Sequence, residues 1–245
     1  MRYLILSDLH SNLEATQSVL ADASTRGFDR VAVLGDIVGY GGNPNEVVEL
    51  IRGLSPSASV RGNHDKAACG ITDGETFNDI AREAVLWTRG VLTPENHAYL
   101  KGLPEGPIET DEFMIVHGSP VDEEEYIMGE TDAADVFARR RFDVAFFGHS
   151  HFACLFAQTA GRARLSMIGR DHATMPLRQG TRYLVNPGSI GQPRDHNPKA
   201  SYAIFDPSGR RLEMYRVSYD IEAAQASIEA QGLPAVLASR LALGV

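Results

Sequence analysis

Short polar motifs hold most of the histidines in this chain of 245 residues. Five of the eight histidines lie in SDLHSN, RGNHD, HGSP and FFGHSH, and GDIVGYG adds an aspartate between the first two segments. The side chains of interest are Asp8, His10, Asp36, Asn63, His64, His117, His149 and His151. Imidazole and carboxylate ligands together suit manganese, iron, zinc or nickel. We therefore expect a metal site, because packing alone does not explain this concentration of ligands.

The spacing of the motifs suits two ions rather than one. D-x-H and H-x-H place both side chains of a pair on the same side of an extended segment, so each pair reaches a common site. Two divalent cations about 3.5–4 Å apart call for a shared carboxylate that offsets their repulsion. Asp36 is the candidate bridge. We expect two divalent ions, with Mn²⁺ as first choice and Fe, Zn or Ni as alternatives.

Each motif directly follows an apolar run that is typical of a strand. The predicted strands are Tyr3–Leu6, Val31–Leu34, Ala58–Val60, Phe113–Val116 and Val144–Phe147. Open α/β sheets carry their chemistry at the carboxyl ends of such strands. Glycines in three of the turns, Gly35, Gly62 and Gly148, allow sharp bends.

Helical patterns separate and follow these strands. One helix is predicted over Leu13–Thr25, and another begins with Pro44 after a capping Asn43. Residues 66–107 lose the strand pattern and predict a small helical cap insert, with one helix burying Ile80, Ala84, Trp87 and Val91. Strand patterns return after position 153, at Ala153–Ala157, Tyr183–Val185, Tyr202–Phe205 and Leu212–Val217, and residues 219–245 predict a C-terminal helical tail. We interpret residues 1–245 as one α/β domain that carries an insert.

Composition excludes several classes of protein. The net charge is −9, from 23 basic and 32 acidic residues, and no basic run predicts a long nucleic-acid partner. No apolar stretch is long enough to span a membrane, and the start MRYLILSD lacks the pattern of a signal peptide, so a cytoplasmic protein is expected. Cys69 and Cys154 fit neither a disulfide framework nor a thiolate zinc site.

The ordered series D-x-H, G-D, G-N-H-D, H-G and G-H-x-H, from Asp8 through at least Gly191, resembles the calcineurin-like metallophosphoesterases. The resemblance implies a four-layer α/β/β/α sandwich of two mixed sheets, with a dinuclear metal site at the strand ends. It implies that His64 stays off the metals, near the leaving-group oxygen, while a metal-activated water attacks phosphorus. It assigns one ion to Asp8, His10, Asp36 and His151, and the other to Asp36, Asn63, His117 and His149.

One departure from the superfamily pattern narrows the substrate. Related protein phosphatases carry G-D-x-V-D-R-G, whereas Gly39 and Tyr40 occupy the later aspartate and arginine positions here. A phosphoprotein phosphatase is therefore disfavoured, and the support of His64 falls to Asp65 or to another loop. GDIVGYG and the chain length are more similar to small bacterial and archaeal phosphoesterases that act on phosphodiesters. The alternative is a dinucleoside polyphosphate hydrolase.

Three further residues are candidates for substrate contact, each with a simpler alternative. Tyr40 stacks on a nucleobase or binds a phosphate, or else packs on the insert. Arg194, in NPGSIGQPR, binds a phosphate or is a solvated loop charge. Arg61 reaches the substrate or forms an ion pair that supports its loop. The acidic run Asp122–Glu125 is expected to be a solvated loop.

A non-catalytic scaffold is the competing class of function. Scaffolds with this fold tend to lose metal ligands or the catalytic histidine, whereas every ligand type and His64 are present here. An enzyme acting on a small phosphorylated or nucleotide-like substrate is preferred. The insert and the tail shape either the cleft or a contact in a homo-oligomer.

Overall fold

Two six-stranded mixed sheets form the centre of the computed structural model, which describes residues 1–245. Their strands are β1 (Tyr3–Leu6), β2 (Arg30–Val33), β3 (Ala58–Ser59), β4 (Ile108–Glu109), β5 (Met114–Ile115), β6 (Val144–Phe146), β7 (Ala153–Thr159), β8 (Arg162–Met167), β9 (His172–Pro176), β10 (Arg182–Pro187), β11 (Ala200–Asp206) and β12 (Arg211–Val217). The first sheet has the order β3-β2-β1-β11-β12-β9, and the second has the order β4-β5-β6-β10-β7-β8. Strands β1, β2 and β3 run parallel to one another, as do β5, β6 and β10.

Eight α-helices and one short 3-10 helix surround the sheets. They are α1 (Leu13–Arg26), α2 (Pro44–Leu54), α3 (Asn63–Ala68), α4 (Asp79–Val91), α5 (Pro94–Gly102), α6 (Glu130–Arg139), α7 (Ile221–Ala230), α8 (Ala235–Ser239) and η1 (Arg240–Ala242). None of these helices combines the length and the apolar character needed to cross a membrane.

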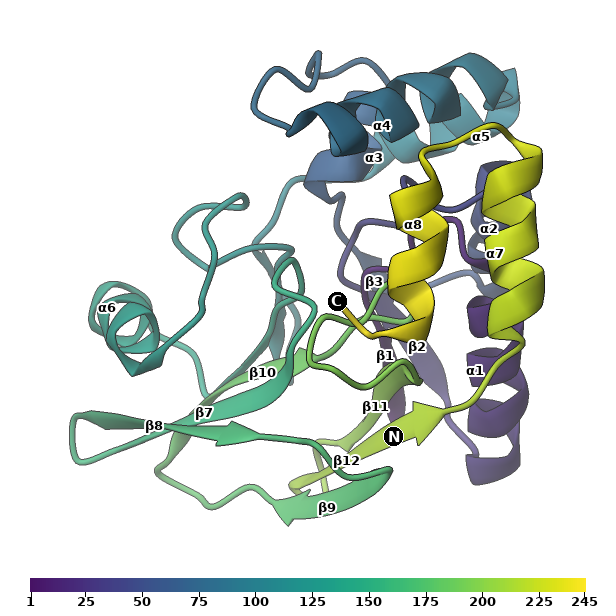
Figure 1. Ribbon diagram of the computed structural model, residues 1–245. Helices are drawn as coiled ribbons and strands as arrows, with labels where there is room; N and C mark the ends of the chain where they lie inside the picture. Colours follow the sequence, from purple (N-terminus) through teal and green to yellow (C-terminus); the bar gives the residue numbers. More distant parts are fainter.

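The layers follow from strands that are buried on both faces. In β1, Tyr3 and Ile5 point into the core between the two sheets, whereas Leu4 and Leu6 point outward toward α1 and α2. Helix α6 covers the outer face of the second sheet (Figure 1). The α/β/β/α architecture is confirmed. Parallel strands that are buried on both faces consist of continuous apolar runs, and such runs predicted these strands from the sequence.

Helices α1 and α2 begin at the residues that the sequence predicts, Leu13 and Pro44. Asn12 caps α1, with its side-chain oxygen accepting from the amide of Ala15 at 3.0 Å. Pro44 begins α2 as predicted. Asn43 occupies the N-cap position of α2 as predicted, but its side chain makes no capping hydrogen bond, because its oxygen accepts instead from the Ser227 hydroxyl at 2.5 Å. This bond joins the start of α2 to α7.

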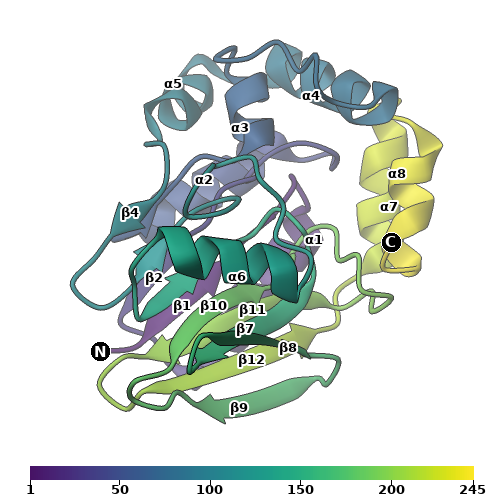
Figure 2. The ribbon, with the colours of Figure 1, turned by 90° about the vertical axis from the view of Figure 1, so that its left-hand side faces the viewer.

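The insert and the C-terminal tail pack against each other. Figure 2 shows α4 passing over the sheets toward α7 and α8. The predicted buried face of α4 is right for Ala84 but wrong for Ile80 and Val91, which are each 40% exposed. The other buried side chains of α4 are Ala81, Val85 and Thr88. A separate apolar cluster joins this face to the tail, with the members Tyr40, Ala81, Ala84, Ala224, Ile228, Leu233, Leu237, Ala238 and Leu241.

Three strands were not predicted. β4 has only two residues, and β8 and β9 lie at the outer edges of the two sheets. β8 has the sequence RARLSM, in which polar and apolar residues alternate but no side chain is fully buried, and two of the six residues are arginines. Edge strands carry such residues because one of their sides faces solvent.

Candidate active site

The carboxyl ends of neighbouring parallel strands bring the polar motifs together. Asp8 and His10 follow β1, and Asp36 follows the adjacent β2. His117 follows β5, and His149 and His151 follow β6, its parallel neighbour in the second sheet. The polar loops of the two sheets therefore lie together at one edge of the sandwich.

Two buried clusters of possible metal ligands share one carboxylate. Within each cluster, all ligand atoms lie within 4.8 Å of one another. The first cluster contains Asp8, His10, Asp36 and His151, and the second contains Asp36, His117 and His149. The amide oxygen of Asn63 lies 3.0 Å from His117 Nε2 and so adjoins the second cluster. This grouping matches the division that the resemblance implies, with Asp36 between the two halves.

The orientation of the Asp36 carboxylate suits a bridge. Its Oδ1 accepts from the backbone amide of His64 at 2.9 Å. Its Oδ2 lies 3.6 Å from His10 Nε2 and 3.4 Å from His117 Nε2, which belong to different clusters. One oxygen is thus fixed by the backbone, and the other faces both groups of imidazoles.

Hydrogen bonds to backbone carbonyls settle which nitrogen of three imidazoles is protonated. In each ring Nδ1 donates to a backbone carbonyl. His10 donates to Val38 O at 3.1 Å, His117 to Leu34 O at 2.9 Å, and His151 to Gln192 O at 2.6 Å. A carbonyl only accepts, so Nδ1 carries a proton in each ring, and Nε2 of the neutral His10 and His151 rings presents a lone pair. Burial lowers the pKa of His117, but the Asp36 carboxylate outweighs burial and raises this pKa to about 9, so Nε2 of His117 also carries a proton, which a bound cation would replace. Such second contacts orient histidine ligands in metal sites.

Two of these lone pairs face each other. His10 Nε2 and His151 Nε2 are 3.1 Å apart, close to the carboxylates of Asp8 and Asp36. Neutral rings in this tautomer cannot donate to each other through Nε2, so the contact is repulsive unless a cation attracts both nitrogens. The residues therefore fit a bound divalent cation, and the mixed nitrogen and oxygen donors suit a first-row transition metal.

Burial sets the protonation of these ligands. It raises the pKa of Asp8 to about 6 and lowers the pKa of His149 to about 3. Burial alone would also raise the pKa of Asp36, but the neighbouring imidazoles of His117 and His64 hold it well below its ordinary value. Anionic carboxylates and neutral imidazoles are the forms that bind metals.

The backbone at the candidate ligands has an uncommon conformation. Five of them have positive φ, between 47° and 64°: Asp8, His10, Asp36, His149 and His151. This left-handed region is sparsely populated by residues with side chains, although aspartate and histidine enter it more often than most. Its concentration at one site is typical of functional centres, where the surrounding structure holds the strain.

Two of the three turn glycines are needed because other atoms lie very close to them, and not because the backbone bends sharply there. Gly35 has a φ of +91° and does need its conformational freedom. Gly62 and Gly148 lack a positive φ. A Cβ at Gly62 would lie 2.0 Å from Asp36 Oδ1, and one at Gly148 would lie 2.2 Å from the Ser7 hydroxyl.

Gly62→Ala is therefore expected to displace the Asp36 carboxylate and to lower the number of tightly bound metal ions per chain. The new methyl group would overlap the carboxylate and the backbone amide of Asp36, at 2.4 Å, neither of which is a flexible side-chain end. Metal content after desalting measures the effect. The matched control is Gly53→Ala in α2, where nothing lies within 4 Å; it is expected to keep full metal content and to add about 0.5–1 kcal/mol of stability. Equal metal content in both variants would contradict the account.

A cavity of about 120 Å³ opens beside the two clusters. Of the predicted substrate contacts, Tyr40 and Arg194 line it and Arg61 does not. Its lining residues are Asp36, Tyr40, Asn63, His64, Thr76, Phe77, Asn78, Ala81, Tyr126, His149, His151 and Arg194. No sequence pattern predicted Phe77 or Tyr126 as a cavity residue, because neither follows a strand motif and their approach to the site depends on the packing of loops.

Arg194 reaches this cavity without a carboxylate partner. Its Nη2 donates to Gln192 Oε1 at 3.0 Å and lies 3.4 Å from the Tyr40 hydroxyl, while its buried Nε has no partner. The loop is anchored by the next residue, because Asp195 forms a bidentate ion pair with Arg216, and these side chains are only 7% and 1% exposed. The guanidinium of Arg194 therefore retains donors for an anionic ligand.

Asp195→Ala is expected to lower the free energy of unfolding by about 3–5 kcal/mol, because it leaves the Arg216 charge buried without its partner. A protein of this size then melts about 6–20 °C lower, as thermal unfolding of the purified variant would show. The control is Asp135→Ala, which breaks an ion pair with Arg139 whose side chains are 56% and 55% exposed. Its cost is expected to stay below about 1 kcal/mol. Similar melting temperatures for the two variants would contradict this prediction.

Arg61 and the acidic run form an ion-pair network. Arg61 Nη2 lies 2.9 Å from Glu105 and 3.4 Å from Glu123, and Lys66 Nζ lies 2.8 Å from Glu123 and also contacts Glu124. The expectation of a solvated loop holds for Asp122 and Glu124, which are exposed, but it is wrong for Glu123, which the buried Lys66 draws onto the insert. Tyr126, just after this run, stacks on the His149 imidazole with ring centroids 3.8 Å apart.

His64 lines the cavity, and Asp65 does not support its ring. The Asp65 carboxylate accepts from the backbone amides of Ile37, Val38 and Gly62 at 2.9–3.2 Å, so it braces the loops instead. His64 Nδ1 is buried and has no hydrogen-bond partner. Burial lowers the pKa of His64 to about 4, so the ring is neutral near pH 7.

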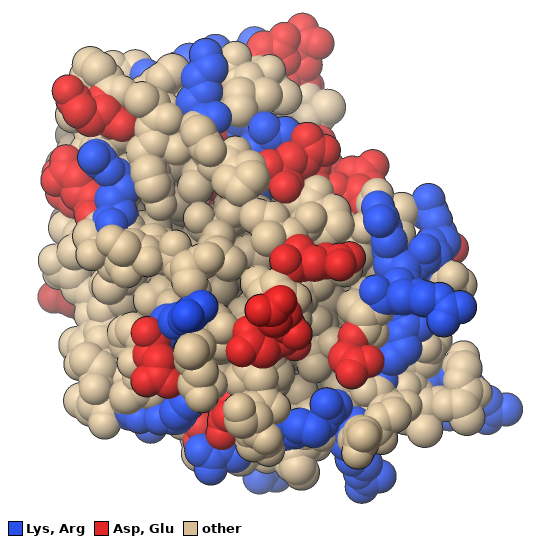
Figure 3. Space-filling model, turned by 180° about the vertical axis from the view of Figure 1, so that it is seen from behind, with Lys and Arg blue, Asp and Glu red and all other residues tan.

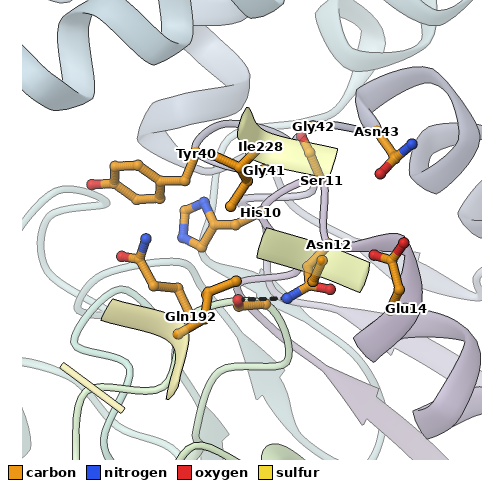
Figure 4. A pocket seen from close by; sticks show the side chains of 13 residues that line it. His10, Ser11, Asn12, Glu14, Tyr40, Gly41, Gly42, Asn43, Gln192 and Ile228 are labelled. Atoms are coloured by element: carbon orange, nitrogen blue, oxygen red, sulfur yellow. Dashed lines mark hydrogen bonds between the residues drawn. The ribbon is translucent and has the colours of Figure 1, made fainter. Parts of the chain in front are cut away.

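A second, much smaller cavity of about 10 Å³ lies behind His10 (Figure 4). It separates the metal-site loops from α7 and η1, whose Ala224, Ile228 and Leu241 form one wall. In its lining, the Asn12 amide donates to Gly191 O at 3.0 Å, the dashed bond in Figure 4. Its volume is that of about one water molecule, so it is too small to hold a substrate.

The sequence as a whole agrees with this geometry. Residues 1–210 match the calcineurin-like phosphoesterase superfamily domain. The chain belongs to this superfamily. It is 42% identical over 245 residues to the uncharacterized protein MJ0912 of Methanocaldococcus jannaschii, with 98% of this chain and 97% of that protein covered. A metallophosphoesterase structure from Sphaerobacter thermophilus is also 42% identical, with a TM-score of 0.90 and coverage of 100% and 99% of the two chains.

A more distant relative has a more specific name. Phosphodiesterase YfcE of Escherichia coli strain K12 is 24% identical over 212 residues, which cover 84% of this chain and 88% of that protein. Members of the superfamily hydrolyse phosphate esters with divalent metal ions, and this chain has buried Asp/His clusters suited to such ions.

Proposed function

We propose that this protein hydrolyses phosphodiesters, or related small phosphate esters, in a reaction that requires two divalent cations, Mn²⁺ being the first choice. The observation that carries the proposal is the pair of buried clusters that share Asp36 and open into one cavity. Bound there, two cations supply Lewis acidity, which polarises a phosphoryl oxygen and lowers the pKa of a water molecule. One cation would be held by Asp8, His10, Asp36 and His151, and the other by Asp36, Asn63, His117 and His149.

Residues of the cavity wall complete the catalytic site in this proposal. Arg194 binds a non-bridging phosphoryl oxygen, since its guanidinium has free donors and no carboxylate competes for them. His64 lines the same cavity and belongs to neither metal cluster, and it stabilises the oxygen of the leaving group. The aromatic rings of Tyr40, Phe77 and Tyr126 limit the access of water to the reacting centre.

The side chains of the lining favour a diester over a monoester. The two cations would attract either ester, and beyond them Arg194 is the single cationic side chain that lines the cavity, which suits the lower charge of a diester. The relative named phosphodiesterase supports the same choice. The three aromatic rings of the lining favour one alternative, a dinucleoside polyphosphate, because a nucleobase stacks on such surfaces.

Long nucleic acids remain outside the proposed substrate class. On the face that Figure 3 shows, acidic and basic side chains are interspersed, and the basic ones are most numerous along the right and lower edges. The net charge of −9 opposes binding that follows a phosphate backbone over many nucleotides.

The test compares three substrates with metal-stripped protein reloaded with Mn²⁺: a generic phosphodiester, a phosphomonoester and diadenosine tetraphosphate. The proposal predicts the highest kcat/KM for the diester. A preference for diadenosine tetraphosphate would select the alternative. No turnover of any substrate by protein that binds two ions would favour a scaffold.

A further inference from the structure

Hydrophobic contacts, rather than a polar partner, surround the one histidine of the cavity that lies outside the metal clusters. The His64 ring centroid lies 4.4 Å from that of Tyr40 and 4.6 Å from that of Phe77. His10 adds an edge contact at 4.9 Å. These distances are within the range of favourable aromatic contacts.

No side chain hydrogen-bonds to the buried Nδ1 of His64. The nearest backbone on this side is Gly39, where a Cβ would lie 2.4 Å from Nδ1. Any larger residue at position 39 would therefore collide with the imidazole, and a φ of +95° disfavours a substitution there in any case. The glycine leaves room for the ring on this side, and the aromatic neighbours of His64 oppose rotation of the ring.

Phe77 comes from the insert, a part of the chain that carries none of the metal-ligand motifs. It precedes α4, and its amide donates to Gly74 O at 3.1 Å in a tight turn. Its ring packs partly into the core formed by the insert and the tail, so its position is fixed from behind. Tyr40 belongs to that same core and lies beside His10 in Figure 4. The insert thus contacts the site through Phe77, and the core that it forms with the tail contacts the site through Tyr40.

We propose that Phe77, together with Tyr40, is a positioning residue that holds the His64 imidazole in its productive orientation. This inference rests on the proposed function, in which His64 acts on the leaving group. Since the insert carries Phe77, the packing of α4 against α7 and α8 determines how well His64 is aligned. A misplacement of a catalytic group by about 1 Å can cost a hundredfold in rate.

The test is a double-mutant cycle on the manganese-loaded enzyme with two phosphodiester substrates. The two share one alcohol group and differ in the leaving group, which is phenol in one and p-nitrophenol in the other. Phe77→Ala is expected to lower kcat for the phenyl ester by about tenfold to a hundredfold. The loss should be smaller for the p-nitrophenyl ester, whose leaving group needs less help, and KM should change little. In a His64→Ala background, Phe77→Ala should have almost no further effect, because the two residues act as one unit.

The controls separate positioning from general damage. Phe77→Leu keeps part of the bulk and should recover part of the rate, and Ile80→Ala, 40% exposed on the same insert, should match the wild type. Equal losses for the two esters, or an equal loss in the His64→Ala background, would overturn the inference. An inactive wild type, or a His64→Ala variant as active as the wild type, would overturn the proposed function instead.

A readout without turnover tests the inference independently. In the Zn²⁺-loaded wild type, in which the metal ion does not broaden NMR signals, the signals of the His64 ring should show contacts to the Phe77 ring and one fixed orientation. Phe77→Ala should broaden the His64 signals or split them into several sets, beyond the shift that loss of the neighbouring ring causes by itself, while the signals of His117 stay in place. A single sharp set of His64 signals in a folded Phe77→Ala protein would contradict the positioning role, whatever the enzyme's substrate.

Discussion

Asp36→Asn is expected to remove at least one of the two bound metal ions and to lower kcat/KM by more than about a hundredfold, since loss of even an outer contact in a metal site costs ten- to a hundredfold. Asp36 is the one residue common to both clusters, and its Oδ2 faces an imidazole of each. An amide keeps the shape of the side chain and loses its charge, so two cations would then approach without a negative group between them.

The measurement for Asp36→Asn combines metal content with the rate of phosphodiester hydrolysis. The control is Asp135→Asn on α6, whose side chain is 56% exposed and lies outside both clusters. It should bind two ions and keep the wild-type rate. Full metal occupancy together with full activity in Asp36→Asn would show that the clusters do not share a bridging carboxylate.

His64→Ala is expected to lower kcat by about 10²–10⁴-fold, the usual contribution of a positioned proton donor or acceptor, while metal content stays at the wild-type level. His64 lines the cavity with Asp36 and Arg194, yet it belongs to neither ligand cluster. Its backbone amide donates to Asp36 Oδ1 and is retained in the variant, so the bridge should stay in place.

Metal analysis and kinetics on the same sample distinguish His64 from a ligand. His97→Ala in α5 is the control, because His97 does not line the cavity. That variant should match the wild type in both measurements. A fall in metal content for His64→Ala would mean that the residue acts as a ligand or as a support for one, contrary to the role proposed here.

The sequence predicted the parts of the site that depend on short-range order. Each ligand directly follows an apolar strand, so its place in the chain also fixes the edge of the sheet to which it belongs. All four residues of β1 and the last three of β2 are buried, which explains their continuous apolar runs. The α/β/β/α architecture was predicted only through the resemblance of the motifs to the superfamily.

The parts that escaped prediction depend on contacts between distant segments. The face of α4 was misassigned because its partner is the tail, about 140 residues further along the chain, and not the central sheets. Phe77 and Tyr126 approach the histidines through loops whose path is fixed by tertiary packing and by ion pairs such as Lys66–Glu123. The left-handed backbone of Asp8 and His149 is likewise imposed by the assembled site.

The central claim is that catalysis requires both cations at a site bridged by Asp36. The most direct test titrates metal-stripped protein with Mn²⁺ and records bound metal and hydrolysis of a phosphodiester in the same samples. The account predicts negligible turnover before metal is added, two ions bound at saturation, and full activity only as the second ion binds. Turnover by the stripped protein, or full activity with a single bound ion, would contradict it.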